Sequence, residues 1–187
     1  MICRETRSSA VIDTGGNPDA VIKKATELGL KPEKILLTHA HFDHAGGLQK
    51  LDKAFACPVW IDKKEPKPSG SRSYKYIADG EILKLGKINI EILFTPGHTP
   101  GHMSFEIADG STSALIIGDA LNNHHVAFKR PHWLSGLDQH PEEAALTRKK
   151  LLNRMSNEDI IVVGFHLPNG GIGRVVQTDD HYSFVNI

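Results

Sequence analysis

The stretch LLTHAHFDHAGG, from Leu36 to Gly47, places His39, His41, Asp43 and His44 within six positions, directly after an apolar run. Neutral imidazoles and carboxylates are ligands for divalent transition metals, and packing gives no reason to crowd them together. His39 and His41 alternate along an extended loop and therefore face the same way, whereas Asp43 and His44 turn on to the next position. We interpret this loop as a ligand source for two metal ions.

Three further candidate ligands each come at or just after the end of an apolar run that predicts a strand. They are His98 in TPGHTPGH, Asp119 in IIGDA and His166 in VVGFH. Strand ends are rigid, and several of them can converge at one edge of a sheet. Seven ligands are too many for one tetrahedral ion, but they suit two ions that share a bridging carboxylate. The absence of thiolate ligands favours two Zn²⁺ ions, with Mn²⁺ or Fe²⁺ as alternatives.

The elements that must position these residues follow from apolar periodicity and turn residues. The first part of the chain reads as alternating strands and helices, which predicts an α/β fold. A Pro-, Ser- and Lys-rich segment, residues 63–76, reads as an exposed connection. After it we predict a β-meander, then a helix over 141–155 that serves as plain covering structure, then a strand and a terminal hairpin. The predicted strands are 9–16, 33–39, 57–62, 81–86, 88–94, 103–108, 113–119, 159–166 and a hairpin over 173–185, and the other predicted helices are 17–30 and 44–55.

Length and composition narrow the classes of protein. The 187 residues fit a single domain, 1–187, and 22 basic residues balance 22 acidic ones, so a nucleic-acid partner is not expected. No apolar run approaches the roughly 18 residues that would span a bilayer. The chain begins without the apolar core of a signal peptide, and its two cysteines are not in CxxC spacing, so we expect a cytoplasmic protein that acts on a small molecule, without a membrane partner.

In their order and spacing, THAHFDHAGG, TPGHTPGH, GDA and the late strand-end histidine resemble the motifs of the metallo-β-lactamase-fold superfamily, over nearly the whole chain. The resemblance implies a four-layer αββα sandwich with the metals at one edge. It also implies that Asp13 orients a ligand histidine. We interpret His102 separately, as a residue that either supports a ligand or has a structural role. The ligand set that it implies is His39, His41 and His98 for one ion, Asp43, His44 and His166 for the other, and Asp119 as the bridge.

Such a site predicts hydrolysis, in which a metal-bridging hydroxide attacks a carbonyl or phosphoryl group while Asp43 and Asp119 fix its position. The segment after Asp119 looks most like the organophosphate hydrolase and lactonase branch. This favours an ester or lactone substrate, with Phe128, His132 and Trp133 lining an apolar pocket or else anchoring a loop. The alternatives are a glyoxalase II-like thioesterase, a mono-iron sulfur dioxygenase, a β-lactamase, a nuclease and a non-catalytic binding protein of the same fold.

The chain departs from the family pattern at its start, because only about a dozen residues precede the VIDTGG strand. Family members usually carry a first hairpin there. We therefore expect a shortened N-terminus, either a truncation or an apolar edge covered by a partner chain, and a homodimer is the predicted assembly.

Overall fold

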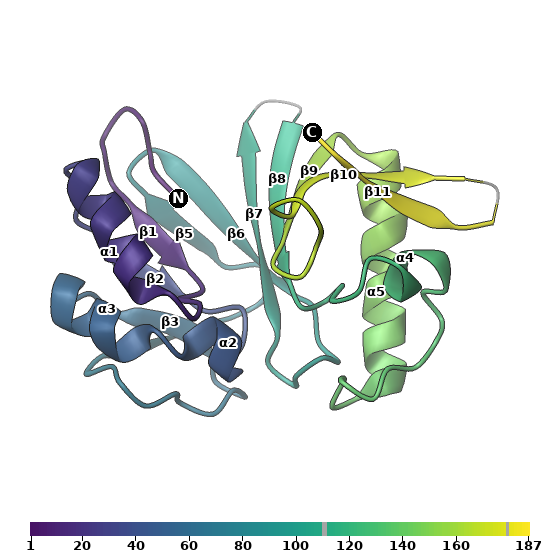
Figure 1. The fold of residues 1–187 in the computed structure, drawn as a ribbon, viewed down its shortest axis with the longest axis horizontal. Coiled ribbons are helices and arrows are strands. Elements are labelled where there is room, and N and C mark those ends of the chain that lie inside the picture. Colours follow the sequence, from purple (N-terminus) through teal and green to yellow (C-terminus); the bar gives the residue numbers. More distant parts are fainter. Residues whose placement is uncertain (110–111, 179) are drawn as a thin grey trace.

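A computed structural model describes residues 1–109, 112–178 and 180–187. Two β-sheets face each other, and helices cover their outer faces (Figure 1). The predicted αββα sandwich is thus confirmed. No helix in the described ranges is long and apolar enough to cross a membrane.

The first sheet contains four parallel strands in the order β1-β2-β3-β4, and its connections carry α1 and α3 across its outer face. Helix α1 begins where the sequence indicates, because Asn17 caps it through the N–H of Ala20 and a proline occupies the first turn. The bounds are β1 (Ala10–Ile12), α1 (Pro18–Glu27), β2 (Lys34–Leu36), α2 (Phe42–Ala45), α3 (Leu48–Phe55), β3 (Val59–Asp62) and β4 (Tyr74–Ile77).

Strand β4 corrects the prediction that residues 63–76 form only an exposed connection. Its residues pair in parallel with β3, from Val59 opposite Tyr74 to Asp62 opposite Ile77. The preceding Pro- and Ser-rich residues concealed this short edge strand, because their composition is typical of a loop.

The second sheet has seven strands in the order β11-β10-β9-β8-β7-β6-β5. The predicted meander and terminal hairpin are present, and the long helix α5 crosses over between the parallel strands β8 and β9. The bounds are β5 (Ile82–Leu85), β6 (Ile88–Phe94), β7 (Met103–Asp109), β8 (Thr112–Gly118), α4 (Val126–Lys129), α5 (Pro141–Asn157), β9 (Ile160–Gly164), β10 (Ile172–Gln177) and β11 (Tyr182–Asn186).

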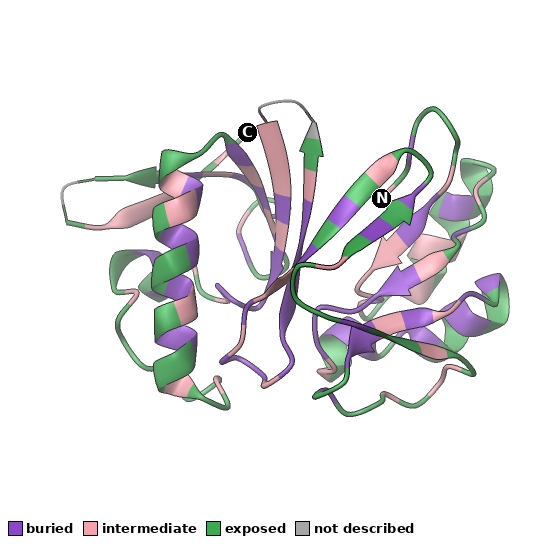
Figure 2. Cartoon of the chain, turned by 180° about the vertical axis from the view of Figure 1, so that it is seen from behind, coloured by how far each residue is buried: buried purple, intermediate pink, exposed green. Residues whose placement is uncertain are grey.

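Alternation along the strands divides the core into layers. In β2, Ile35 faces the helices, whereas Leu36 packs between the sheets with Ile90 and Phe105 of the second sheet. On the far side, buried and exposed residues alternate along α5, as the purple and green segments in Figure 2 show. Each sheet therefore buries both faces over part of its area, which makes its strand ends rigid supports.

Four of these supported ends lead into the candidate ligands. His39 follows β2, and His98 follows β6. Because β8 and β9 are parallel neighbours that align Gly118 with Gly164, Asp119 and His166 emerge at the same edge of the sheet. The topology thus brings segments far apart in sequence to one place.

The turn that carries His98 is packed directly against the first two turns of α5. Thr147 Oγ1 donates a hydrogen bond to the carbonyl of Pro96, and the His140 N–H donates to the carbonyl of Gly97. Gly97 has a φ of 122°, and a Cβ placed there would lie 2.1 Å from the Ala144 nitrogen. Only glycine permits this approach of helix and turn.

We expect Gly97→Ala to lower the free energy of unfolding by about 2–5 kcal/mol. The positive φ accounts for about 1–2 kcal/mol and overpacking against α5 for about 1–3 kcal/mol. Gly80→Ala is the matched control, because Gly80 also has a positive φ, of 73°, but nothing lies within 4 Å of a Cβ there. Urea unfolding of both variants tests this, and equal losses would contradict the close packing.

Candidate metal centre

The first group of candidate ligands joins the loop after β2 to the turn after β6. One nitrogen from each of His39, His41 and His98 lies within 4.8 Å of the other two. The Nδ1 atom of His41 is 3.0 Å from His39 Nε2 and 3.0 Å from His98 Nε2. The predicted HxH motif and the distant His98 therefore meet at one point.

The second group comprises Asp43, His44, Asp119 and His166, whose ligand atoms again lie within 4.8 Å of one another. His166 Nε2 is 3.2 Å from Asp43 Oδ2 and 3.4 Å from Asp119 Oδ2. Asp119 also reaches the first group, since its Oδ2 atom is 3.5 Å from His98 Nε2. All seven predicted ligands thus converge at one edge, with Asp119 between the two groups.

The first group fits a cation better than it fits a set of hydrogen bonds. A single proton on His41 Nδ1 cannot satisfy the Nε2 atoms of both His39 and His98. Protonation does not resolve this, because burial and the neighbouring imidazoles hold the pKa values of His39 and His41 below their usual range. A divalent ion between the three nitrogens satisfies all of them at once.

The second group also needs positive charge. His44 Nε2 and Asp119 Oδ1 lie 3.1 Å apart, and both are buried without a directed hydrogen bond to any residue that the structure describes. Burial lowers the pKa of His44, but the carboxylates of Asp119 and Asp13 on either side outweigh it and raise the pKa to about 10. In the metal-free protein a proton compensates these carboxylates, and a metal ion would compensate them in its place.

Asp13 holds the metal-binding loop from behind, as the sequence predicts. Its Oδ2 atom is 2.8 Å from His44 Nδ1, and its two oxygens accept hydrogen bonds from the N–H and the hydroxyl of Thr38. Asp13 itself has a φ of 50°, a conformation that aspartate tolerates better than most residues. These contacts fix the orientation of His44.

Glu65 is a buried residue of the site that sequence reasoning missed. Its Oε2 accepts a hydrogen bond of 2.9 Å from the N–H of Ala40, and its Oε1 accepts one of 2.9 Å from the N–H of Gly101. One carboxylate therefore ties the HxHxDH loop to the TPGHTPGH turn. No motif marks this residue, because a glutamate between lysine and proline is typical of an exposed loop.

His102 is fully buried beneath Asp119 and has the predicted structural role. Its Nε2 accepts a hydrogen bond of 3.0 Å from the Asp119 N–H, so its Nδ1–H donates to Thr95 Oγ1 at 2.8 Å. Burial, reinforced by nearby His98, lowers the pKa of His102 to about 3. A neutral imidazole thus fixes the backbone at the start of the Asp119 loop.

The prediction that Phe128 lines a substrate pocket is wrong. Phe128 is completely buried in α4, within the core beneath the second sheet, where its ring centroid is 6.0 Å from that of Phe184. The sequence does not distinguish an aromatic residue that lines a pocket from one that packs in the core. In the structure Phe128 lies in the short helix α4, which directs its side chain into the core.

His132 and Trp133 are exposed, and neither lines the pocket at the centre. The backbone carbonyl of Trp133 accepts a hydrogen bond from Arg148, while its side chain is largely exposed. The pocket at the centre has a volume of about 280 Å³. Its lining residues are His41, Asp43, His98, Asp119, Asn122, Leu137 and His166.

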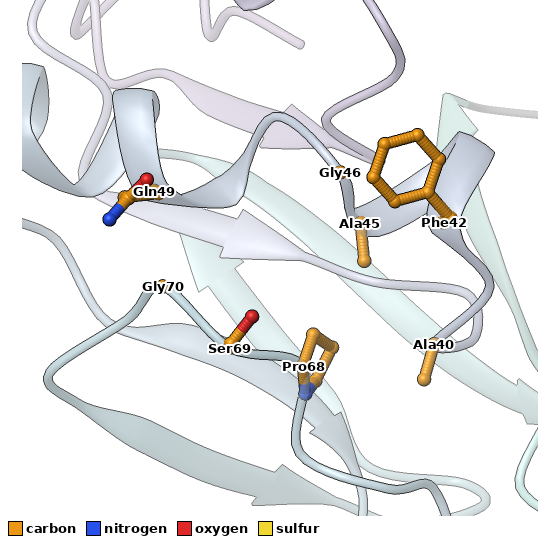
Figure 3. Close-up of a pocket in the computed structure, with 8 residues that line it drawn as sticks. All are labelled: Ala40, Phe42, Ala45, Gly46, Gln49, Pro68, Ser69 and Gly70. Atoms are coloured by element: carbon orange, nitrogen blue, oxygen red, sulfur yellow. The ribbon is translucent and has the colours of Figure 1, made fainter.

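A second hollow, of about 350 Å³, lies beside the loop that carries Ala40 and Phe42 (Figure 3). Ala40 and Phe42, which flank His41, form one wall together with α2, and Pro68 and Ser69 form the other. None of its lining residues is charged.

Comparison with known proteins agrees with this geometry. The model of the family described as "Metallo-beta-lactamase superfamily" matches residues 1–166. The hydroxyacylglutathione hydrolase GloC of Haemophilus influenzae is 30% identical over an alignment that covers 89% of this chain and 83% of that protein. This chain spans only 41 to 45% of several other hydroxyacylglutathione hydrolases.

Solved structures show the same fold. The hydrolase AbOPH of the β-lactamase superfamily superimposes with a TM-score of 0.81 and 25% identity, over 96% of this chain and 76% of that one. TTHA1623 in a di-iron-bound form gives a TM-score of 0.66 and 27% identity, over 84% and 81% of the two chains.

Replacing Phe128 with alanine tests its reassignment to the core. We expect the free energy of unfolding to fall by about 3–5 kcal/mol, as for other buried aromatic residues, with Zn²⁺ binding unchanged in the folded fraction. Chemical unfolding and a Zn²⁺ titration measure the two effects. A variant that is as stable as the wild type but binds Zn²⁺ differently would show that Phe128 belongs to the metal centre and not to the core.

His102 predicts a pH dependence of stability in the metal-free protein. Its pKa is about 3 in the folded chain and about 6.5 in the unfolded chain. Below pH 6.5 the unfolded chain therefore binds a proton that the folded chain does not. The free energy of unfolding therefore decreases as the pH is lowered. We expect the wild type to lose up to about 1.4 kcal/mol per pH unit more than His102→Gln between pH 6 and about 4. Urea unfolding across this range measures both slopes, and parallel slopes would refute a neutral His102.

Proposed function

This chain belongs to the metallo-beta-lactamase superfamily, and on that premise we propose that it is a dinuclear metal-dependent hydrolase of carboxylic esters and lactones. The observation that carries the proposal is the position of Asp119. Its Oδ1 faces His44 of one ligand group, and its Oδ2 faces His98 of the other. A carboxylate shared in this way suits two cations side by side.

The residues divide into two cation sites. The shared Asp119 contributes to both, and each site has three ligands of its own. His39, His41 and His98 would hold the first cation, and Asp43, His44 and His166 the second. The set of imidazoles and carboxylates suits zinc, and the di-iron-bound relative supports iron as the alternative occupant.

Two bound divalent cations would supply Lewis acidity, which polarises the scissile carbonyl and makes water a nucleophile at neutral pH. The protein's own part is to position the reactants. Asp43 and Asp119 line the pocket, where their oxygens accept hydrogen bonds from the attacking water and fix its direction. Asn122 lines the same pocket and offers an amide that can donate to the substrate carbonyl.

The surroundings of the pocket favour an uncharged, apolar substrate. Leu137, which lines the pocket, is 70% exposed, and Phe42, which lines the neighbouring hollow, is 82% exposed. Phe165 packs beside His44 and His166, with ring centroids 4.3 and 4.9 Å away. Among the described residues that line the pocket and the neighbouring hollow there is no lysine or arginine. Exposed apolar residues around a polar site provide contact area for an acyl or alkyl group.

A second candidate is a thioesterase. The similarity to GloC, over most of both chains, supports hydroxyacylglutathione as its substrate. The absence of lysine and arginine from the pocket lining weighs against this candidate, because glutathione carries carboxylates that a cationic side chain would bind.

We expect the wild type to bind two Zn²⁺ per chain. We also expect its kcat/KM for a hexanoate ester and for a six-carbon lactone to be at least tenfold higher than that for S-lactoylglutathione. Chelation should abolish turnover, and Zn²⁺ should restore it. Elemental analysis and steady-state kinetics on one preparation measure both. A preference for the glutathione thioester would select the second candidate, and full Zn²⁺ loading without turnover of any of the three would refute the hydrolase.

A further inference from the structure

His98 is supported from behind by a buried carboxylate that does not belong to either ligand group. Asp138 Oδ1 lies 3.1 Å from His98 Nδ1, and the two side chains are only 4% and 5% exposed. The backbone reinforces this contact, because the N–H of Gln139 donates to the carbonyl of His98 at 3.0 Å. The segment before α5 therefore holds both the side chain and the main chain of His98.

The buried charge of Asp138 is compensated from α5. Arg148 Nη2 lies 3.2 Å from Asp138 Oδ2, and its Nη1 donates to the Trp133 carbonyl at 3.4 Å. The Arg148 side chain is 5% exposed, so this is a buried ion pair. Burying two charges is costly unless they are paired and hydrogen-bonded, and this pair lies where a plain covering helix would need only apolar residues.

The arrangement determines which nitrogen of His98 is available. A carboxylate beside Nδ1 accepts a hydrogen bond from the Nδ1–H group, so Nε2 carries the lone pair. Nε2 points to the centre, 3.0 Å from His41 Nδ1 and 3.5 Å from Asp119 Oδ2. His44 is held in the same way by Asp13, 2.8 Å from its Nδ1, on the other side of the centre. Each ligand group therefore contains one imidazole fixed by a buried carboxylate.

We propose that Asp138 and Arg148 are positioning residues, which fix the tautomer and ring orientation of His98 and so set the affinity of the first group for its cation. This inference rests on the proposed function, since it requires that the first group bind a cation. Partners of this kind typically change metal affinity by about 10- to 100-fold when they are removed. Helix α5 is then part of the metal centre as well as a cover for the sheet.

The same helix offers a matched control. Arg154 pairs with the buried Glu106 through two hydrogen bonds of 2.7 and 2.8 Å. Like Arg148, it links α5 to a buried carboxylate, but neither Arg154 nor Glu106 contacts a residue of the two ligand groups. If breaking a buried ion pair on α5 is by itself enough to weaken Zn²⁺ binding, Glu106→Gln should therefore weaken it equally.

The experiment compares wild type, Asp138→Asn, Arg148→Lys and Glu106→Gln as full-length folded proteins. Zn²⁺ binding is titrated in competition with a chromophoric chelator, and the visible spectrum of the Co²⁺-loaded protein reports the ligand geometry. In Asp138→Asn we expect one of two Zn²⁺ to bind 10- to 100-fold more weakly, with a changed Co²⁺ spectrum. Arg148→Lys keeps the charge and should show a smaller loss, and Glu106→Gln should bind both ions as the wild type does.

Wild-type Zn²⁺ affinity in both Asp138→Asn and Arg148→Lys would overturn the proposal, as would an equal loss in Glu106→Gln. If Asp138→Asn does not fold, the Zn²⁺ affinity of Arg148→Lys decides, and an affinity equal to that of the wild type would overturn the proposal. Because the readout is Zn²⁺ binding, a wild type that binds two ions without hydrolysing the substrates refutes the hydrolase and leaves this test intact. A wild type that binds no Zn²⁺ overturns both.

Discussion

The carboxylate of Asp119 lies among imidazoles that three separate segments of the chain contribute. It is 6% exposed, and its distances to His44, His98 and His166 are 3.1 to 3.5 Å. A carboxylate in such a place is tolerated only if positive charge and directed hydrogen bonds compensate it. The neighbouring structure is arranged around this constraint: His102 fixes the backbone at Asp119 from below, and the two ligand groups surround its oxygens.

The rigidity of the centre depends on carboxylates that are not themselves members of the two ligand groups. Asp13 fixes Thr38 and His44, and Glu65 joins the backbone at Ala40 to that at Gly101. A loop rich in glycine and histidine would otherwise have many accessible conformations, and ordering it on metal binding would reduce the affinity. Because these buried carboxylates order the loop when the chain folds, the conformational entropy is already lost before a cation binds.

The sequence alone predicts which histidines and aspartates converge, because their spacing carries the information. HxHxDH within one loop, and single histidines or aspartates at strand ends, follow from the geometry of strands and turns. The pocket residues could not be predicted in this way. Phe128 is as compatible with a core as with a pocket, and its orientation depends on the short helix α4. Glu65 and Asp138 were missed because their partners lie 25 to 40 positions away, and no local pattern records such contacts. Strand β4 was hidden by the loop-like composition before it.

The division of the ligands between the two sheets has a consequence for assembly. The first sheet contributes the four residues of the loop after β2, which are His39, His41, Asp43 and His44. The second sheet contributes three residues that follow its strands, which are His98, Asp119 and His166. Neither sheet carries a complete donor set for two ions. The centre therefore exists only when the two halves of the sandwich are docked against each other. A cation bound there would add its binding free energy to the association of the sheets, acting as a clamp across the interface between them.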